Sequence, residues 1–238
     1  MQNWFKSTLP DETIARIRFV ADAFCLPITV AFSGGKDSIV LLDLVRKSGI
    51  MHRAIFNLTT IDPPEIVYFV RNEYPDVTIE RPKYSIWQLI VKKRMPPTRG
   101  VRYCCQILKE RKRFGLTLTG IRSEESVSRK GRNRIETMAK NRLLYHPILG
   151  WSENGIWEYI EANGLKYPAM YDNGHRRIGC IGCPCATVKE RQMDFEVFPK
   201  YKIAYIRAFD KALKRREAGR YKNEFKDGQE MFDWWMSQ

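Results

Sequence analysis

The segment 33–38, with the sequence Ser-Gly-Gly-Lys-Asp-Ser, limits the folds open to this chain more than any other segment. The apolar, β-branched run at 28–32 before it predicts a buried strand, and the run at 39–47 after it predicts a helix that ends at Gly49. A glycine-rich turn between a strand and a helix exposes backbone N–H groups at the positive end of the helix, where Lys36 adds a full positive charge. The segment therefore predicts a phosphate-binding loop, with a simple capped turn as the alternative.

Predicted strands and helices alternate along the first two thirds of the chain. Besides the strand and helix around the loop, we expect strands at 52–58, 77–80 and 115–120 and helices at 11–24, 64–73, 85–91, 106–113 and 152–163. This alternation predicts a doubly wound α/β fold with a parallel sheet, which binds ligands at the carboxyl ends of its strands. The strand pattern stops after Cys185, and a basic amphipathic helix is expected at 199–218. We therefore expect an α/β domain at 1–186 that includes the cysteines, and a helical extension at 187–238 packed on the same body.

The net charge of +14 is concentrated in the middle of the chain. Segment 92–142 holds 16 basic and 4 acidic residues, whereas segment 1–91 holds 10 of each. Most of these basic residues are arginines, which favours phosphate recognition over a merely solvated surface. The sequence therefore predicts a polyanionic partner, either a nucleic acid or a highly phosphorylated nucleotide.

No segment approaches the roughly 20 apolar residues of a membrane span, and the N-terminal residues lack the pattern of a signal peptide. These features predict a cytoplasmic protein with no membrane partner. In that compartment cysteines stay reduced and more often serve as metal or redox ligands than as disulfides.

Four of the six cysteines form a pattern typical of metal ligands. Cys104 and Cys105 are adjacent, and Cys180 and Cys183 form a Cys-x-x-Cys pair. The second pair of thiolates completes four ligands. An adjacent pair serves one metal ion only with strain but reaches two irons of one cluster, so the pattern favours a 4Fe-4S cluster over structural zinc or a redox dithiol. Cys185 stands close enough to Cys183 to replace it as a ligand.

Together these motifs resemble the phosphoadenosine phosphosulfate reductase family of the ATP-pyrophosphatase (adenine nucleotide alpha-hydrolase-like) superfamily. The resemblance covers about residues 24–199 and rests on the loop at 33–38, Arg-Tyr-Cys-Cys at 102–105, Gly-Ile-Arg at 120–122 and the segment 180–184. The loop lacks the spacing of the common nucleotide loop, which has four residues between Gly and Gly-Lys-Ser/Thr. One nucleotide segment departs from the family, because the usual Asp-Thr-Gly is Leu58-Thr59-Thr60 here.

The resemblance implies roles for individual residues. It implies a nucleotide site made by Ser33, Gly34, Gly35, Lys36, Asp37, Ser38, Thr59, Gly120 and Arg122. It further implies that substrate phosphates are held by Arg129, Arg176 and Arg177, and that a metal centre is held by Cys104, Cys105, Cys180 and Cys183.

Two departures separate the chain from sulfonucleotide reductases. Those enzymes attack sulfur with a cysteine in a C-terminal tail, and this sequence has no cysteine after Cys185. The loop lysine, Lys36, is typical of members that cleave ATP, where departing pyrophosphate must be neutralised. The resemblance therefore implies an ATP-dependent sulfur transferase rather than a reductase.

In that interpretation Lys36, Asp37 and Ser38 are the catalytic residues: Lys36 contacts the β- and γ-phosphates, Asp37 holds Mg²⁺ and Ser38 contacts phosphate. An acceptor oxygen on a tRNA base or a DNA phosphate is adenylated with release of pyrophosphate. Sulfur from a donor protein, such as a cysteine desulfurase, then replaces that oxygen. The alternatives are a reductase that uses an external thiol and a non-catalytic nucleotide- or redox-sensing module. A homo-oligomer is compatible with the sequence.

Overall fold

The computed structural model describes residues 8–110, 115–138, 142–219 and 224–238. Residues 111–114 and 139–141 of the basic segment 92–142 lie outside the described residues. Contacts group the chain into two compact units. Unit 1 comprises Met1–Asn57, Glu65–Glu80 and Lys112–Ile178, and unit 2 comprises Leu58–Pro64, Arg81–Arg111 and Gly179–Gln238.

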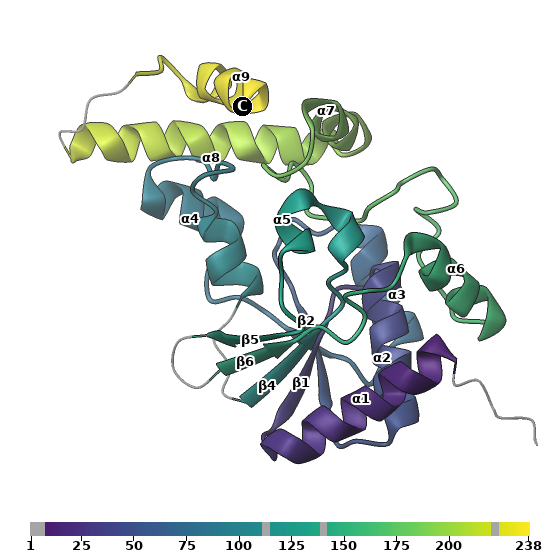
Figure 1. Ribbon diagram of the computed structural model, residues 1–238. Helices are drawn as coiled ribbons and strands as arrows, with labels where there is room; N and C mark the ends of the chain where they lie inside the picture. Colours follow the sequence, from purple (N-terminus) through teal and green to yellow (C-terminus); the bar gives the residue numbers. More distant parts are fainter. Residues whose placement is uncertain (1–7, 111–114, 139–141, 220–223) are drawn as a thin grey trace, which may run out of the picture. The chain divides into compact units, whose positions relative to one another are not determined.

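Unit 1 is built on a six-stranded sheet (Figure 1). The strands are β1 (Ile28–Phe32), β2 (Arg53–Asn57), β3 (Thr78–Glu80), β4 (Gly115–Thr119), β5 (Ile135–Met138) and β6 (Arg142–Tyr145). Their order is β3-β2-β1-β4-β6-β5, and every neighbouring pair is parallel except β5 and β6, which are antiparallel. The strand order reverses between β1 and β4, which is the position where open α/β sheets bind ligands.

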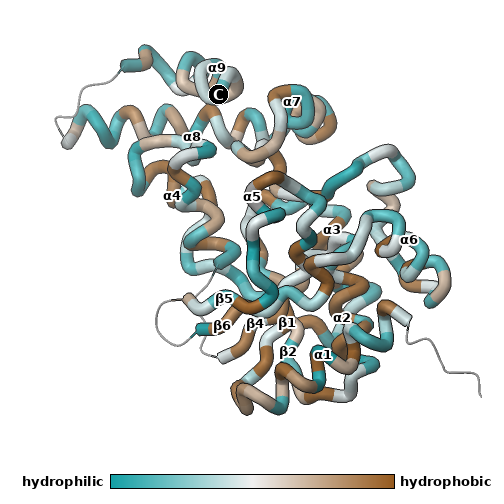
Figure 2. Tube along the Cα trace, in the orientation of Figure 1, coloured by the Kyte–Doolittle hydropathy of each residue, from teal (hydrophilic) through white to brown (hydrophobic). Residues whose placement is uncertain are grey.

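Apolar side chains fill the centre of this sheet. In the parallel register Val30 of β1 lies beside Ala54 of β2 and Leu118 of β4, and all three are buried. Figure 2 shows hydrophobic stretches in the strands and in the neighbouring helix α2. Strands covered in this way read as continuous β-branched and apolar runs, which is why the sequence predicts β1 and β4 so closely.

Capping residues bound several of the helices of unit 1. The helices are α1 (Leu9–Phe24), α2 (Lys36–Ser48), α3 (Pro64–Glu73), α5 (Val127–Lys130) and α6 (Glu153–Ala162), with a 3-10 turn at Ser123–Glu125. Thr8 and Ser152 cap the N-termini of α1 and α6 through their hydroxyl oxygens. Helix α2 ends at Gly49 in the left-handed conformation (φ 72°) and packs against α1, α6 and β1.

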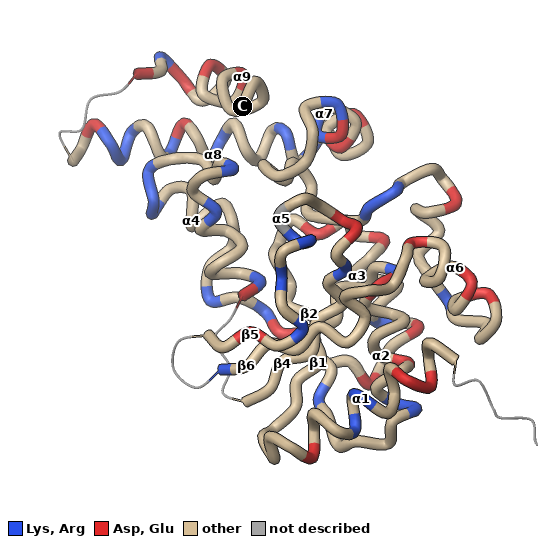
Figure 3. The backbone as a smooth tube through the Cα atoms, viewed as in Figure 1, with Lys and Arg blue, Asp and Glu red and all other residues tan. Residues whose placement is uncertain are grey.

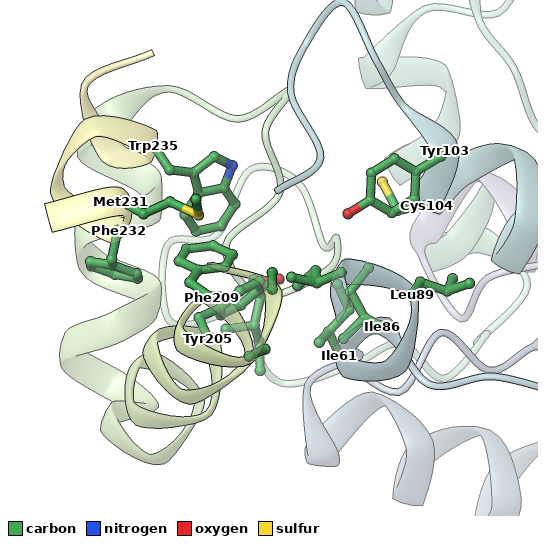
Figure 4. Packing of buried hydrophobic residues seen from close by; sticks show 14 of the residues in the cluster. Ile61, Ile86, Leu89, Tyr103, Cys104, Tyr205, Phe209, Met231, Phe232 and Trp235 are labelled. Atoms are coloured by element: carbon green, nitrogen blue, oxygen red, sulfur yellow. The ribbon is translucent and has the colours of Figure 1, made fainter. Parts of the chain in front are cut away.

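Unit 2 is helical and is held together by aromatic side chains. Its elements are α4 (Ile86–Lys93), a π-helical turn (Cys105–Lys109), α7 (Val188–Val197), α8 (Pro199–Ala218) and α9 (Gly228–Ser237). Helix α8 packs against both α4 and α9. Tyr205 and Phe209 of α8 meet Trp235 of α9 in a buried cluster (Figure 4). The indole N–H of Trp235 donates to the carbonyl oxygen of Pro97 at 2.7 Å, which satisfies its one polar group.

Most predicted elements are present with small changes in their ends. The helix expected at 106–113 is instead a π-helical turn at Cys105–Lys109, and residues 111–113 lie outside the described part of the chain. The hairpin of β5 and β6 and helix α7 were not predicted. The predicted domain boundary after residue 186 stays a prediction. The four cysteines predicted as metal ligands fall in the same compact unit as the C-terminal helices. None of the described helices is both long and apolar enough to cross a membrane.

Candidate functional site

The loop that follows β1 belongs to unit 1 and leads directly into α2. Gly34 has φ 74°, and a Cβ atom there would lie 3.0 Å from Val70 Cγ2, so a larger residue would strain the backbone and crowd Val70. Gly35 is the N-cap of α2 and Lys36 is its first residue. The Ser38 hydroxyl donates to the Gly35 carbonyl oxygen at 2.8 Å and accepts from the Ser33 backbone N–H at 3.1 Å. The predicted turn is therefore formed, and Ser38 holds it closed.

Lys36 is buried at the start of α2, with 5% of the residue exposed. Its ammonium nitrogen lies 3.4 Å from Glu153 Oε1 and 3.6 Å from Asp37 Oδ2. It also donates to the carbonyl oxygen of Arg176 at 3.4 Å. A buried lysine held by two carboxylates is a positive charge fixed in position, and an incoming phosphate can take over those contacts.

Tyr171 closes over the same helix end. Its hydroxyl oxygen accepts a 3.0 Å hydrogen bond from the backbone N–H of Lys36, and its ring centroid lies 5.5 Å from the Lys36 ammonium. Burial raises the pKa of Tyr171, so its hydroxyl stays protonated. Nothing in the sequence around Tyr171 indicated its contact with Lys36, 135 positions away.

Arg122 joins the turn after β4 to the loop. Its guanidinium Nε donates to Asp37 Oδ1, and Nη1 donates to Glu124 Oε2 at 3.1 Å. The residue is 2% exposed. Burial opposes its charged form, but Asp37 outweighs this and the pKa of Arg122 is raised. Gly120 permits the approach, because a Cβ there would lie 3.0 Å from the backbone of Asp37.

The predicted substrate-phosphate residues also lie in unit 1. Arg129 pairs with Glu125, and Glu125 Oε2 in turn accepts the Arg122 backbone N–H at 3.0 Å. Arg176 and Arg177 are exposed, and the carbonyl oxygen of Arg176 accepts a hydrogen bond from the Lys36 ammonium. Unit 1 thus brings together the loop, Gly120, Arg122 and Arg129, whereas Arg176 is connected through its backbone.

Thr59, the remaining predicted nucleotide residue, belongs to unit 2. Its hydroxyl lies 3.5 Å from Cys180 Sγ, and its backbone N–H donates to Asp62 Oδ2 at 2.6 Å. Within its own unit, Thr59 is thus a neighbour of the cysteines.

The four predicted metal ligands line one cavity of unit 2. It holds about 360 Å³ of empty space, including its open mouth. The lining consists of Thr59, Ile61, Pro97, Cys104, Cys105, Leu108, Lys109, Cys180, Cys183, Pro184 and Tyr205. Cys185 is absent from this lining and its Sγ lies 4.0 Å from Arg102 Nη1. Cys183, and not Cys185, is therefore the thiol that shares this cavity with the other three.

Local backbone contacts hold the Cys-x-x-Cys turn. The Cys183 N–H donates to the Cys180 carbonyl oxygen at 3.1 Å, and Ile181 N–H donates to the Ile61 carbonyl oxygen at 2.8 Å. Gly182 has φ 68°, and a Cβ there would lie 2.5 Å from Phe195 Cζ. Glycine is thus required at this turn by both its backbone and its packing.

The thiols differ in their electrostatic surroundings. A hydrogen bond with Cys104 lowers the pKa of Cys105 to about 6, against the opposing effect of burial and with the help of Lys109. That same hydrogen bond, with burial, raises the pKa of Cys104. Burial raises the pKa of Cys183, and the neighbouring Cys180 raises that of Lys109. The cavity therefore combines soft sulfur donors with a cation that stabilises thiolates.

This donor set fits a metal centre in its chemistry. Four thiols around one cavity are the ligands used by iron–sulfur clusters and by structural zinc. Among the described residues, no three His, Cys, Asp or Glu side chains stand in the arrangement of a metal-ion site. The fit therefore rests on the identity and common location of the sulfur atoms.

Residues 27–186 match the phosphoadenosine phosphosulfate reductase domain. The chain belongs to that family. This confirms the resemblance on the larger part of the sequence, and with it the fold. A crystallised phosphoadenylyl-sulfate reductase from Candida auris superimposes with a TM-score of 0.51 at 21% identity, covering 71% of this chain and 87% of the other.

Proteins similar to this chain differ in the activities for which they are named. An uncharacterized protein of Methanocaldococcus jannaschii is 33% identical over 190 residues, which are 73% of this chain and 39% of the relative. An adenosine 5'-phosphosulfate reductase of Oceanobacillus iheyensis is 26% identical over 200 residues, 76% of this chain and 81% of the relative. A probable FAD synthase of Schizosaccharomyces pombe is 26% identical over 228 residues, 86% and 82% respectively. The chain spans 39% of the length of that M. jannaschii protein and 45% of the length of a second uncharacterized protein from the same organism, less than half in both cases.

Proposed function

We propose that this member of the phosphoadenosine phosphosulfate reductase domain family is an ATP-dependent sulfur transferase with an iron–sulfur cluster. In this proposal it adenylates an oxygen of a nucleic acid, releases pyrophosphate and exchanges the oxygen for sulfur. The observation that carries it is the buried Lys36 in the Ser-Gly-Gly-Lys-Asp-Ser loop at the N-terminus of α2.

The loop supports cleavage between the α- and β-phosphates of ATP. A fixed ammonium at a helix N-terminus stabilises the negative charge that develops on departing pyrophosphate. Asp37 is turned toward Arg122, and in the ATP complex its carboxylate would hold Mg²⁺. Arg122 and Arg129 then supply guanidinium groups to nucleotide or acceptor phosphates.

The chemistry balances in two displacements. The acceptor oxygen attacks the α-phosphorus, and the α–β phosphoanhydride bond breaks to release pyrophosphate. A sulfur nucleophile then attacks the carbon or phosphorus atom that bears the activated oxygen, and AMP leaves with that oxygen. Hydrosulfide completes the exchange directly. Attack by a persulfide leaves the donor joined to the transferred sulfur through a disulfide bond, and a thiol must supply two electrons to break that bond and release the donor.

The cysteines of unit 2 supply the second half of the proposal. Cys104, Cys105, Cys180 and Cys183 would hold a 4Fe-4S cluster, which would supply inorganic sulfide and redox-active iron when it is bound. The side chains of Lys109 and Thr59 lie beside these sulfurs and stabilise their thiolate charge.

Pyrophosphate release tests this proposal. Anaerobically purified protein is mixed with MgATP, sulfide and either a DNA duplex or a tRNA, and pyrophosphate and AMP are measured. We expect release that depends on the nucleic acid and falls about 100-fold or more in Lys36→Ala, as for loss of one charge-stabilising group. The control Lys166→Ala removes an exposed lysine that pairs with Glu73, and we expect it to leave the rate unchanged.

Other results would replace the proposal with a named alternative. Sulfite release from adenosine phosphosulfate with an added thiol would indicate a reductase, the activity for which the O. iheyensis relative is named. Pyrophosphate release that needs FMN would indicate flavin adenylylation, the reaction class of the S. pombe relative. ATP binding without pyrophosphate release under any condition would indicate a non-catalytic module.

A further inference from the structure

We propose that the exposed face of α8 in unit 2 binds the phosphodiester backbone of a nucleic acid. The inference rests on the proposed function, in which a nucleic acid is the acceptor, and it names the surface that holds it. The surface is defined by Lys200, Arg207, Lys211 and Lys214 and is called the α8 basic stripe.

The first observation is the distribution of charge between the two units. Unit 2 holds 21 lysines and arginines against 11 acidic residues, whereas unit 1 holds 20 against 16. Most of the net positive charge of the chain thus belongs to the unit that contains the cysteines. Figure 3 shows basic positions recurring along α8. Within α8 itself, lysines and arginines outnumber acidic residues seven to two. A helix surface with such an excess attracts polyanions and releases condensed counterions when it binds them.

The second observation is the alignment of the stripe. At 3.6 residues per turn, the four side chains fall within roughly 60° around the helix axis and span about 21 Å along it. All four residues are exposed, and no acidic side chain of the described residues pairs with them. A row of unpaired cations of this length can contact several successive phosphates of a duplex, whose charges recur every 1.7 Å or so of axis.

The third observation is that the opposite face of α8 is anchored. Tyr205, Phe209 and Ala212 are buried against α4 and α9, and Figure 4 shows the first two pointing into the aromatic cluster. The stripe is therefore presented on a fixed helix. A helix that lies on a membrane buries its apolar face in lipid, and here that face is used inside the protein. Charge complementarity thus favours a phosphodiester over a lipid surface.

Salt-dependent binding tests the inference. Fluorescence anisotropy is measured with a 20-bp DNA duplex and with an RNA hairpin, without ATP, from 50 to 300 mM salt. The stripe variant is Arg207→Gln, Lys211→Gln and Lys214→Gln together. Its matched control changes three exposed basic residues of unit 1, namely Arg53→Gln, Arg71→Gln and Lys166→Gln. Circular dichroism and thermal unfolding show that both variants are folded.

We expect the native protein to bind one or both probes with a steep dependence of log K on log salt. Because each lost phosphate contact reduces that slope by about 0.9 for duplex DNA, the stripe variant is expected to lose about 2 to 3 slope units and at least about tenfold in affinity. The control keeps the native slope. The probe that shows the larger loss identifies the nucleic acid as DNA or RNA.

Three results would overturn the inference. The first is an equal slope of log K against log salt in the stripe variant and the control, and the second is no binding of either probe by the native protein. The third is displacement of the probe by polyglutamate at equal charge, which would indicate an acidic protein partner. The proposed function is tested apart from it, since ATP cleavage is measured as pyrophosphate release. If the protein releases pyrophosphate but the stripe variant binds nucleic acid as the native protein does, only the inference about the stripe is refuted. Stripe-dependent binding without pyrophosphate release would refute the transferase alone.

Discussion

The backbone N–H of Lys36 donates a 3.0 Å hydrogen bond to the hydroxyl oxygen of Tyr171. This N–H belongs to the first turn of α2, where a helix leaves its backbone donors for a cap or an anion. Tyr171 therefore occupies, with a neutral oxygen, a donor that a phosphate oxygen would use. The contact makes Tyr171 a competitor of the nucleotide.

Removing the Tyr171 hydroxyl is expected to strengthen nucleotide binding. In Tyr171→Phe the Lys36 N–H has no phenolic acceptor, and ATP no longer needs to displace one. Since a hydrogen bond of this kind contributes about 0.5–1.5 kcal/mol, the Kd for MgATP is expected to fall about two- to tenfold by calorimetric titration. Tyr167→Phe is the control, because its hydroxyl contacts Asp172 and its ring packs on the same Trp157. Weaker binding by Tyr171→Phe would instead make the hydroxyl part of the phosphate site.

The pair formed by Arg122 and Asp37 is expected to stabilise unit 1. Arg122→Met removes the hydrogen-bonding partner of the Asp37 carboxylate and leaves it the Lys36 ammonium at 3.6 Å. Breaking a fully buried pair from one side costs about 3–5 kcal/mol, so we expect a loss at or below about 3 kcal/mol here. Urea denaturation measures the free energy of unfolding. The double variant with Asp37→Asn is expected to be less destabilised than the sum of the single variants. Additive effects would show that the two side chains do not interact energetically.

Local sequence patterns predicted the elements that carry the loop. The run at 28–32 and the periodicity at 39–47 correspond to β1 and α2, because a buried parallel strand and an apolar helix each have a characteristic period. The hairpin of β5 and β6 was missed because Ile135 and Met138 are exposed at the edge of the sheet. An edge strand with polar neighbours lacks the alternation that marks a half-buried strand.

The contacts that complete the site could not be predicted from spacing. Tyr171 reaches Lys36 across 135 positions, and Thr59 reaches Cys180 across 121. Such pairs depend on how loops return to the same end of a unit, and a single sequence carries no periodic signal for that. The four cysteines could be grouped from the sequence, because thiols in adjacent and Cys-x-x-Cys pairs are typical ligands of one shared metal centre.

The cysteine cavity predicts which thiols are needed for a metal centre. In anaerobically purified protein we expect about four irons and four acid-labile sulfides per chain, with visible absorption that is lost in Cys183→Ala. Cys185→Ala is expected to keep the iron, because Cys185 does not line the cavity. Cys25→Ala, which changes an exposed cysteine of α1's C-cap, is a second control. One zinc per chain in a colourless protein would exclude the cluster and leave a structural metal.

Burial of His146 predicts a loss of stability in acid. Its Nδ1 lies 2.6 Å from Thr119 Oγ1, and Nε2 lies 3.7 Å from Glu136 Oε2. Burial lowers the pKa of His146, an effect that Glu136 opposes and that Arg132 and Arg129 support. The folded protein therefore keeps a neutral imidazole under conditions in which the unfolded chain, with a pKa near 6.5, binds a proton.

The sign of the pH effect follows from this difference in bound protons. Below about pH 6.5 the unfolded state binds more protons, so the free energy of unfolding falls as pH falls, by at most about 1.4 kcal/mol per pH unit for one group. We expect His146→Asn, which retains a polar atom facing Thr119, to have a shallower decrease between pH 7 and 5 in urea denaturation. His52→Asn, at a half-buried position before β2, serves as the control and should keep the native slope. Equal slopes in all three proteins would show that His146 is protonated in the folded state as readily as in the unfolded chain.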